Sequence, residues 1–384
     1  MNSSCLEKGG GDIRQPGRAV VEAMLAAADI AVNGSRPFDI QVRHPRFFRR
    51  VLSEGSLGLG ESYMDGWWEC ERLDVFFQRA LRAGLERRLP HRLRDILYAM
   101  AARLFNPQSL RRARHVGERH YDLGNDLFAA MLDPHMQYSC AYWNRAATLE
   151  QAQEDKLRLI CDKLQLAPGM HLLDIGCGWG GLAAYAASHY GVTVTGVTIS
   201  EQQRQLAEAR CAGLAVTIRL QDYRQLRLKA DRIASVGMFE HVGPRNYRAF
   251  FDVAARNLKP DGLLLLHTCG SRVGDMRVDP WIEKYIFPNG CLPSIGQIDE
   301  ASSAGWVMED WHNFGADYDL TLMAWLQRFQ QAWPQLSGRY PQRFYRMFSY
   351  YLNACAGAFR ARDLQLWQVL FSPQGVEGGL RVAR

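Results

Sequence analysis

The sequence contains no run of about 18 consecutive apolar residues, the length that a membrane-spanning helix requires. The apolar run Leu263–Leu266 is far too short. The first residues, MNSSCLEKGGGD, lack the basic segment and apolar core that together form a secretory signal peptide. These absences predict a protein that stays in the cytoplasm and does not cross the membrane.

Disulfide bonding and metal binding also have little support. The nine cysteines are an odd number and include no C-x-x-C pair, which predicts reduced thiols rather than a disulfide framework. No group of cysteines and histidines has the spacing of metal ligands. We therefore expect neither a bound metal nor a disulfide.

Charge is balanced except in one segment. The net charge is +6, but residues 79–119 hold eleven arginines against three acidic residues. Apolar spacing predicts amphipathic helices over Leu73–Leu85 and Leu93–Phe105, and basic amphipathic helices are typical of membrane surfaces. A solvated face is the alternative, and nucleic-acid binding is disfavoured because only two aromatic residues lie among the arginines. We expect the segment to dock on an anionic membrane through arginines that include Arg111, Arg112 and Arg114.

The segment Leu172–Gly181, LLDIGCGWGG, is the feature around which the chain is organised. A short apolar strand leads into a glycine turn, and a helical pattern follows. Glycines at such a turn allow a ligand to approach the backbone closely. The spacing G-x-G-x-G differs from the dinucleotide fingerprint, and no Lys-Ser/Thr pair follows to complete a phosphate-binding loop. With Asp174 before the turn, the pattern resembles the cofactor loop of S-adenosylmethionine (SAM)-dependent methyltransferases.

Strand and helix patterns alternate regularly around this turn. The alternation predicts an α/β fold with a doubly wound parallel sheet, the Rossmann-like sheet of class I SAM-dependent methyltransferases. A largely helical insertion over Leu320–Arg362 is expected before the last strand. The predicted strands are His171–Ile175, Val192–Val197, Ala215–Leu220, Asp231–Val236, Leu263–Thr268, Trp306–Phe314 and Gln365–Phe371.

A smaller α+β domain is expected before the sheet. Within it, Gly55–Cys70 is rich in glycine and aromatic residues and is interpreted as a packed loop. The predicted organisation is an N-terminal lipid- or membrane-binding domain over residues 1–105, a linker over 106–119 and a catalytic domain over 120–384.

Polar residues follow several predicted strands at their carboxyl ends, where ligands bind in open α/β sheets. The second strand ends without the acidic residue that commonly binds ribose, so Thr198, Ser200 or Gln203 would supply neutral hydrogen bonds. Asp222 and Tyr223 follow the third strand, where an acidic residue commonly binds the adenine amino group. These positions favour binding of a nucleoside-containing cofactor.

Glu240 and His267 are the candidates for acid–base chemistry. Glu240 follows the fourth strand, and His267 lies inside the apolar fifth strand. A lone histidine in a strand is commonly a core residue. Beside a carboxylate at the neighbouring strand end, burial and charge tune both groups for proton transfer.

The chain resembles the bacterial cyclopropane-fatty-acyl-phospholipid synthase family over nearly its whole length. The similarity extends from GLGESYMDGWW near the start to NACAGAFRARD near the end. The other motifs that carry it are HYDLGNDLF, QYSCAYW, LDIGCGWGG, GVTIS, MFEHVG, DPWIEKYIFPNG and EDWHNFGADYD.

The resemblance implies an enzyme that uses SAM to add a methylene bridge across the cis double bond of an unsaturated acyl chain in a membrane phospholipid. Methyl transfer would leave a carbocation, and a bound bicarbonate ion would remove a proton so that the ring closes. A homodimer at the inner face of the cell membrane is also implied, without nucleic acid as a partner.

The same resemblance implies site residues. Position 269 is a cysteine where the family pattern leads us to expect isoleucine, although its contribution is through the backbone. Cys355 matches a possible nucleophile, but transfer to an alkene needs no covalent protein intermediate, so a packing role is the alternative. The bicarbonate-binding and catalytic residues would be Cys140, Glu240, His267, Cys269 and Tyr318. SAM would be surrounded by Tyr138, Ser139, Gly176, Gly178, Thr198, Ile199, Gln203, Asp222 and Tyr223.

An acyl chain also needs an apolar slot. We expect aromatic residues after the fifth strand to line it, with ordinary core packing as the alternative for each. These residues are Trp281, Tyr285, Phe287, Trp311 and Phe314.

Other functions fit parts of the pattern. A methyltransferase acting on a phospholipid amine head group would need no proton-removing cluster. Methylation of mycolic acids is a less favoured alternative, because the enzymes that carry it out lack an extra basic N-terminal domain of this size. An RNA-binding module with a vestigial methyltransferase fold would need more aromatic residues among the arginines.

Overall fold

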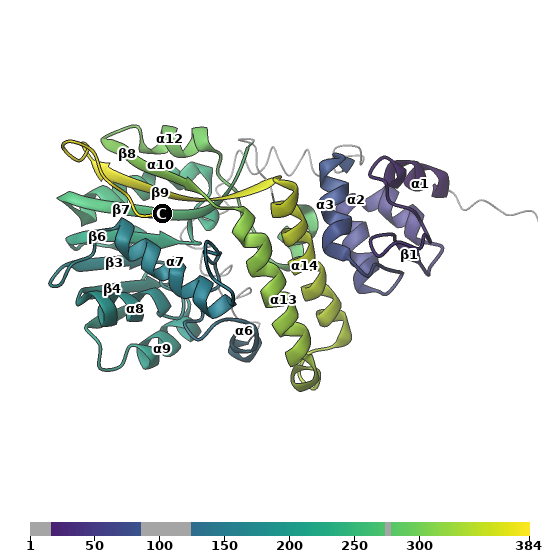
Figure 1. Cartoon of the computed structure of the whole chain (residues 1–384), viewed down its shortest axis with the longest axis horizontal. Coiled ribbons are helices and arrows are strands. Elements are labelled where there is room, and N and C mark those ends of the chain that lie inside the picture. Colours follow the sequence, from purple (N-terminus) through teal and green to yellow (C-terminus); the bar gives the residue numbers. More distant parts are fainter. Residues whose placement is uncertain (1–16, 86–123, 273–277) are drawn as a thin grey trace, which may run out of the picture.

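A seven-stranded sheet forms the centre of the protein (Figure 1). The computed structural model describes residues 17–85, 124–272 and 278–384. The strands lie in the order β5-β4-β3-β6-β7-β9-β8, and all seven were predicted from the sequence. Their bounds are β3 (His171–Ile175), β4 (Thr193–Thr198), β5 (Val216–Leu220), β6 (Ala230–Val236), β7 (Leu258–Ser271), β8 (Trp306–Asn313) and β9 (Leu364–Pro373).

The sheet is parallel except at the edge formed by β9 and β8. Strands β3 to β7 pair in parallel, as expected. Strand β9 is antiparallel to both β7 and β8, at an edge that lies beyond the five strands for which parallel pairing was predicted. Between β8 and β9 the chain forms two long helices, α13 (Ala316–Leu336) and α14 (Gln342–Ala361), which pack on each other. This hairpin of helices returns the chain to the same end of the sheet, so β9 runs opposite to β8.

Helices cover both faces of the sheet. Successive residues of a strand point to opposite faces, and Leu172 and Leu173, both fully buried, belong to two different apolar clusters. One cluster includes side chains of α7 (Leu149–Lys163) and α8 (Gly181–Tyr190), with α9 (Glu201–Arg210) beside α8. The other includes α10 (Tyr247–Asn257) and α12 (Ile295–Ser302). Ligands can therefore approach the sheet only at its rim.

The N-terminal unit, residues 17–85, is mostly helical. Its elements are α1 (Arg18–Ala26), β1 (Gln41–Val42), α2 (Phe47–Met64), β2 (Trp68–Glu69) and α3 (Leu73–Arg82). The predicted α+β character is confined to a ribbon of two-residue strands. The loop predicted over Gly55–Cys70 is wrong for most of its length, because helix resumes after Gly55 and extends to Met64. Gly55 itself has non-helical backbone angles, φ 59° and ψ −137°, so α2 consists of two helical segments that meet at a kink here.

The N-terminal unit packs against α14 and against α11 (Pro280–Tyr285). A Cβ on Gly357 would lie 2.5 Å from the Cβ of Phe77, so only glycine allows α14 to approach α3 this closely. Arg360 of α14 donates to the buried Asp74 carboxylate at 2.6 Å. Burial alone would raise the pKa of Asp74, but hydrogen bonds from Arg72 and Arg360 lower it to about 2. The contact therefore combines close packing with a buried ion pair.

Three predictions lie outside the described residues. They are the helix over Leu93–Phe105, the linker over 106–119 and the membrane-binding arginines Arg111, Arg112 and Arg114. Within the described ranges, every helix is too short or too polar to cross a bilayer. A further short helix, α6 (Asn125–Met131), lies beside α13.

Candidate active site

A cavity of about 200 Å³ lies beside the glycine turn, at the carboxyl ends of β3, β4 and β6. Gly176 has a φ of 86°, and a Cβ there would lie 2.9 Å from the Cβ of Met238. Backbone conformation and space therefore both require glycine at this position. The structure brings together at this cavity all the residues that the sequence predicted around SAM: Tyr138, Ser139, Gly176, Gly178, Thr198, Ile199, Gln203, Asp222 and Tyr223.

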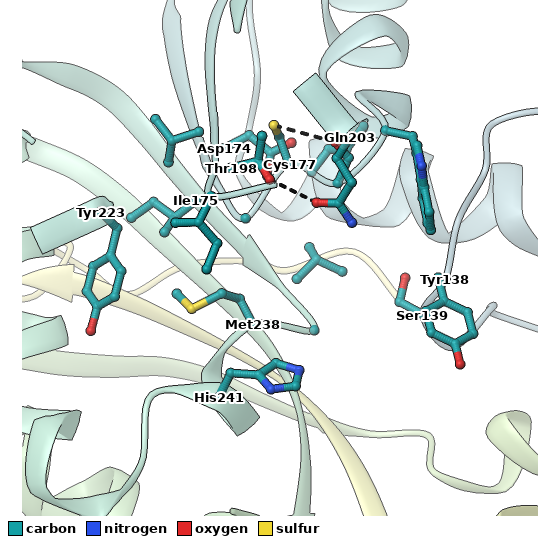
Figure 2. A pocket seen from close by; sticks show the side chains of 18 of the residues that line it. Tyr138, Ser139, Asp174, Ile175, Cys177, Thr198, Gln203, Tyr223, Met238 and His241 are labelled. Atoms are coloured by element: carbon teal, nitrogen blue, oxygen red, sulfur yellow. Dashed lines mark hydrogen bonds between the residues drawn. The ribbon is translucent and has the colours of Figure 1, made fainter. Parts of the chain in front are cut away.

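Neutral polar groups occupy the end of β4, as expected. The Thr198 hydroxyl donates to Gln203 Oε1 at 2.8 Å (Figure 2). This bond orients the Gln203 side chain, so that its amide nitrogen can donate to a ribose hydroxyl. The Ser200 hydroxyl instead accepts from the backbone N–H of Gln203 and caps α9. Thr198 and Gln203 line the cavity, whereas Ser200 caps the helix that carries Gln203.

The carboxylate of Asp222 is paired with a neighbour. Arg224 donates to its two oxygens at 2.8 and 2.7 Å. The backbone N–H of Arg224 also donates to Oδ1, at 2.9 Å, so both lone pairs of Oδ1 are used and Oδ2 keeps the capacity to accept a further hydrogen bond. Asp222 can therefore still accept from an adenine amino group, but as part of an ion pair.

The cavity residues that were absent from the predicted SAM set include Asp174 and His241. Asp174 is 2% exposed, its Oδ2 has no partner within the described protein, and burial raises its pKa to about 7. Burial lowers the pKa of His241 to about 4, so its ring is neutral. Figure 2 shows Met238 and His241 between Tyr223 and Ser139. In the sequence, Asp174 lies two residues before Gly176 of the glycine turn, and His241 directly follows Glu240. These positions were the signals that could have predicted both residues.

Glu240 follows β6 in a single turn, η3 (Phe239–His241). Its Oε1 accepts a hydrogen bond from the backbone N–H of Cys269 at 2.6 Å. Its Oε2 is buried without a partner in the described part of the chain. Burial raises the pKa of Glu240, against the lowering effect of the Cys269 bond. A buried carboxyl oxygen of this kind is able to bind a ligand or to exchange a proton.

His267 is 1% exposed and lies on the same face of β7 as Cys269, two residues away. Its Nδ1 lies 3.2 Å from the amide nitrogen of Gln368 on β9. Its Nε2 is a second buried polar atom without a partner among the described residues. Burial lowers the pKa of His267 well below its usual range, so the ring is neutral near pH 7.

Cys140 and Tyr318 complete what we call the Glu240 cluster, which consists of Cys140, Glu240, His267, Cys269 and Tyr318. Burial raises the pKa of Tyr318 well above its usual range, and the nearby Cys269, Cys140 and Glu240 add to the effect. Burial raises the pKa of the Cys140 thiol in the same way. The structure therefore places the predicted bicarbonate-binding residues together, in a site from which water is largely excluded.

Thr321 of α13 holds Cys140 in this cluster. Its hydroxyl oxygen accepts from the backbone N–H of Ala141 at 3.1 Å and from Nε1 of Trp143 at 2.9 Å. Thr321→Val keeps the shape of the side chain but leaves the buried Ala141 N–H and the partly buried Trp143 Nε1 unpaired. We expect a loss of about 2 to 5 kcal/mol in the free energy of unfolding, measured with denaturant. Thr217→Val on exposed β5 should cost little, and equal stability of the two variants would contradict this role.

A second, apolar cavity of about 330 Å³ lies between the N-terminal unit and α14. Cys269 and Tyr318 of the Glu240 cluster form part of its wall. Phe287 lines both this cavity and the cavity beside the glycine turn, which we call the cofactor cavity after the predicted ligand. Two members of the Glu240 cluster therefore border the apolar cavity, and Phe287 belongs to the walls of both cavities.

The predicted aromatic lining is largely wrong, because only Phe287 of the five residues lines the apolar cavity. Trp281 is fully buried, with its Nε1 donating to the sulfur of Met64. The Tyr285 hydroxyl donates to Glu61, and Trp311 packs on Trp367. Phe314 packs against the rings of Tyr142 and His267. Core packing, the alternative, describes these positions.

Cys355 of α14 lines the apolar cavity. Burial raises its pKa to about 12, so the thiol stays protonated near neutral pH. A thiol is a weak nucleophile compared with a thiolate. This environment favours the packing role, and a nucleophilic role stays a prediction.

Comparison with known proteins fits this geometry. Residues 108–369 match the protein family described as mycolic acid cyclopropane synthetase. The chain is 64% identical to cyclopropane-fatty-acyl-phospholipid synthase of Escherichia coli K12, over the full length of both chains. It is 38% identical to cyclopropane mycolic acid synthase 2 of Mycobacterium bovis, over 65% of this chain and 91% of that protein.

A solved structure shows the same fold with a ligand. The mycolic acid cyclopropane synthase CmaA1, determined with S-adenosylhomocysteine (SAH) and CTAB, is 35% identical with a TM-score of 0.63. The match covers 67% of this chain and 97% of CmaA1. The fold, the family match and the full-length identity show that this chain is a SAM-dependent methyltransferase and belongs to the mycolic acid cyclopropane synthetase family.

Proposed function

We propose that the protein adds a methylene bridge from SAM to the cis double bond of an unsaturated acyl chain in a phospholipid. The observation that carries this proposal is that Phe287 lines both cavities while Cys269 and Tyr318 of the Glu240 cluster line the apolar one. In the proposed site, Phe287 marks the junction of the two cavities. An acyl chain in the apolar cavity would bring its double bond to this junction. A cofactor in the other cavity would reach the same point from the sheet rim.

SAM would supply an electrophilic methyl group. The glycine turn gives its backbone access, Gln203 offers a donor for ribose, and Asp222 offers an acceptor for adenine. The orphaned Oδ2 of Asp174 is a further acceptor for a bound polar group. An alkene is a poor nucleophile, so the residues around the junction act mainly by holding it close to the methyl group in a dry site.

The Glu240 cluster would take up the proton that must leave the new methyl group before the ring closes. Bicarbonate would supply a proton acceptor at this position, held by Glu240 Oε2, His267 Nε2 and the backbone at Cys269. The two orphaned atoms, both buried, support the presence of a small polar ligand here. The backbone contribution of position 269 does not depend on its side chain, so Cys269 in place of isoleucine is compatible with it.

Bicarbonate removal tests this part of the proposal. We expect turnover to fall in buffer that is rigorously free of carbon dioxide, because the Glu240 cluster would lack its ligand. Activity should return when bicarbonate is added and not when chloride is added at equal ionic strength. Full activity without carbon dioxide would exclude the ion from the mechanism.

The main rival is methylation of an amine head group, which would not require the Glu240 cluster. Unsaturated phosphatidylethanolamine vesicles with SAM distinguish the two functions. After ester hydrolysis, mass spectrometry should find the added mass in the fatty acid. Added mass in the head-group fraction would overturn the proposed function.

Phospholipid substrates require contact with a membrane. We propose a domain division with residues 1–105 for lipid binding, 106–119 as linker and 120–384 for catalysis, and peripheral association with the cytoplasmic face. The excess of arginine in residues 79–119 supports this, at roughly 1 kcal/mol for each basic residue near an anionic surface. We also propose a homodimer, which the resemblance suggests and sedimentation would test.

Charge reversal tests the membrane contact. Changing Arg111, Arg112 and Arg114 to Glu should weaken binding to anionic vesicles and reduce its dependence on salt. Co-sedimentation with phosphatidylglycerol vesicles measures both effects, with phosphatidylcholine vesicles as the control. Unchanged binding to the anionic vesicles would argue against this contact.

A further inference from the structure

Lys156 of α7 is a buried cation outside the set of site residues described so far. It is fully buried, and within the described ranges no carboxylate forms an ion pair with it. Its ammonium donates to Gln137 Oε1 at 2.5 Å and to Ser139 Oγ at 2.9 Å. Burying an ammonium without an ionic partner costs several kcal/mol. Such a group calls for a ligand or function that offsets the cost.

Helix α7 holds the cavity segment 137–139 through its main chain as well. The amide of Gln153, one turn before Lys156, donates to the carbonyl oxygens of Gln137 and Ser139 at 3.3 and 3.0 Å. Both anchored residues line the cofactor cavity. A movement of α7 or the loss of Lys156 would therefore displace residues of the cavity wall.

The segment 137–139 forms one end of the cavity. Figure 2 shows Ser139 and Tyr223 on opposite sides. With adenine near Asp222 and Tyr223, the methionyl part of SAM reaches the side of Ser139. The charged groups that line the cavity in the described chain are Asp174, Asp222 and Arg224, and the last two neutralise each other. The lining thus offers no unpaired cation to the methionyl carboxylate.

We propose that Lys156 is a positioning residue for the carboxylate end of SAM, acting through Ser139 and Gln137. The Ser139 oxygen accepts a hydrogen bond from the ammonium, so its own O–H is directed elsewhere, toward the cavity. The Ser139 hydroxyl then donates to the SAM carboxylate. The Lys156 ammonium, which is hydrogen-bonded to the same oxygen, adds a positive charge nearby. This inference rests on SAM as the cofactor of the proposed function.

The electrostatic environment agrees with this role. Burial lowers the pKa of Lys156 to about 8, against the raising effects of Asp133, Cys140 and Asp174. The ammonium therefore remains mostly protonated at pH 7. A bound carboxylate would stabilise the charged form further, because opposite charges attract more strongly in a buried site.

Binding of two ligands tests the proposal. SAM and decarboxylated SAM differ only in the carboxylate, and calorimetry without lipid gives a Kd for each. In wild-type protein we expect SAM to bind more tightly. Lys156→Met should weaken SAM about 10- to 100-fold, the loss of charge-assisted hydrogen bonding, and leave decarboxylated SAM within about threefold. The preference for the carboxylate should therefore nearly disappear.

Lys163 provides a matched control on the same helix. Its side chain is also fully buried, but it pairs with Asp310 at 3.3 Å and does not line the cavity. Lys163→Met should leave the ratio of the two Kd values unchanged.

Two results would overturn the role of Lys156: equal weakening of both ligands by Lys156→Met, or no change in either. If Lys156→Met does not fold, the ratio of the two Kd values is measured with Ser139→Ala instead. In the proposal, the Ser139 hydroxyl makes the direct contact with the SAM carboxylate. A ratio unaffected by Ser139→Ala would overturn the proposal. A wild-type protein that binds neither ligand would contradict the cofactor assignment instead.

Discussion

Glu240→Gln should reduce formation of the lipid product by at least about 100-fold while SAH binds as in the wild type. The amide oxygen can still accept from the backbone N–H of Cys269, so the local fold is kept. The orphaned Oε2 would be replaced by an NH₂ group, which donates and cannot accept. The Glu240 cluster would then lose its ability to take up a proton.

Two measurements separate the chemical effect from binding. Radiolabelled SAM with unsaturated vesicles gives the turnover, and calorimetry with SAH gives the cofactor affinity. Glu300→Gln on α12 is the control, since this side chain is exposed and far from both cavities, and it should behave as the wild type. Wild-type turnover in the Glu240→Gln variant would refute the assigned role.

Ala354→Phe should abolish lipid turnover almost as completely, for a different reason. Ala354 lies on α14 and lines the apolar cavity. A phenyl ring there would occupy space that the acyl chain needs and would displace the double bond from the junction. A displacement of about 1 Å can cost about 100-fold in rate. SAH affinity should be unchanged, because the cofactor cavity has separate walls at this point.

Ala361→Phe is the matched control, because Ala361 lies on the same helix and does not line the cavity. It should retain most of the turnover. Thermal unfolding of both variants shows whether either change disturbs packing of α14 on the N-terminal unit. If a folded Ala354→Phe variant kept wild-type turnover, the acyl chain would have to bind elsewhere.

The residues that line the cofactor cavity could largely be predicted from the sequence, although Tyr138 and Ser139, which precede the sheet, were predicted from the family resemblance alone. The glycine turn at Gly176 and the polar residues at Thr198 and Asp222 all follow strands of a parallel sheet. The carboxyl ends of such strands meet at one rim, so their order in the chain is enough to bring these residues together. Glu240 and His267 were predicted on the same basis.

The apolar cavity could not be predicted in this way. Its walls come from α1, α2 and α3 on one side and from α14 and the segment around Phe287 on the other. These parts are far apart in the sequence, and no strand order fixes their contact. Aromatic character could not separate Phe287, which lines the cavity, from Trp281, which packs in the core. The helix after Gly55 was missed because glycine commonly marks a loop, whereas here it forms a kink between two helical segments.

The antiparallel edge of the sheet also depends on contacts that the order of the strands does not fix. Alternating strands and helices predict parallel pairing only while each connection is a single crossover. The insertion over α13 and α14 contains two helices, and this reverses the direction of β9. Its helical content was predicted, but its effect on β9 depends on how the two helices pack.

Methyl-deuterated SAM tests the central claim most directly. The methyl group is transferred to an alkene carbon and then loses one hydrogen beside the Glu240 cluster. The fatty acid released from the product should therefore contain two of the three deuterium atoms, within a cyclopropane ring identified by the upfield signals of its CD2 group in the deuterium NMR spectrum. A product that retains all three deuterium atoms, in the acyl chain or in the head group, would contradict the claim.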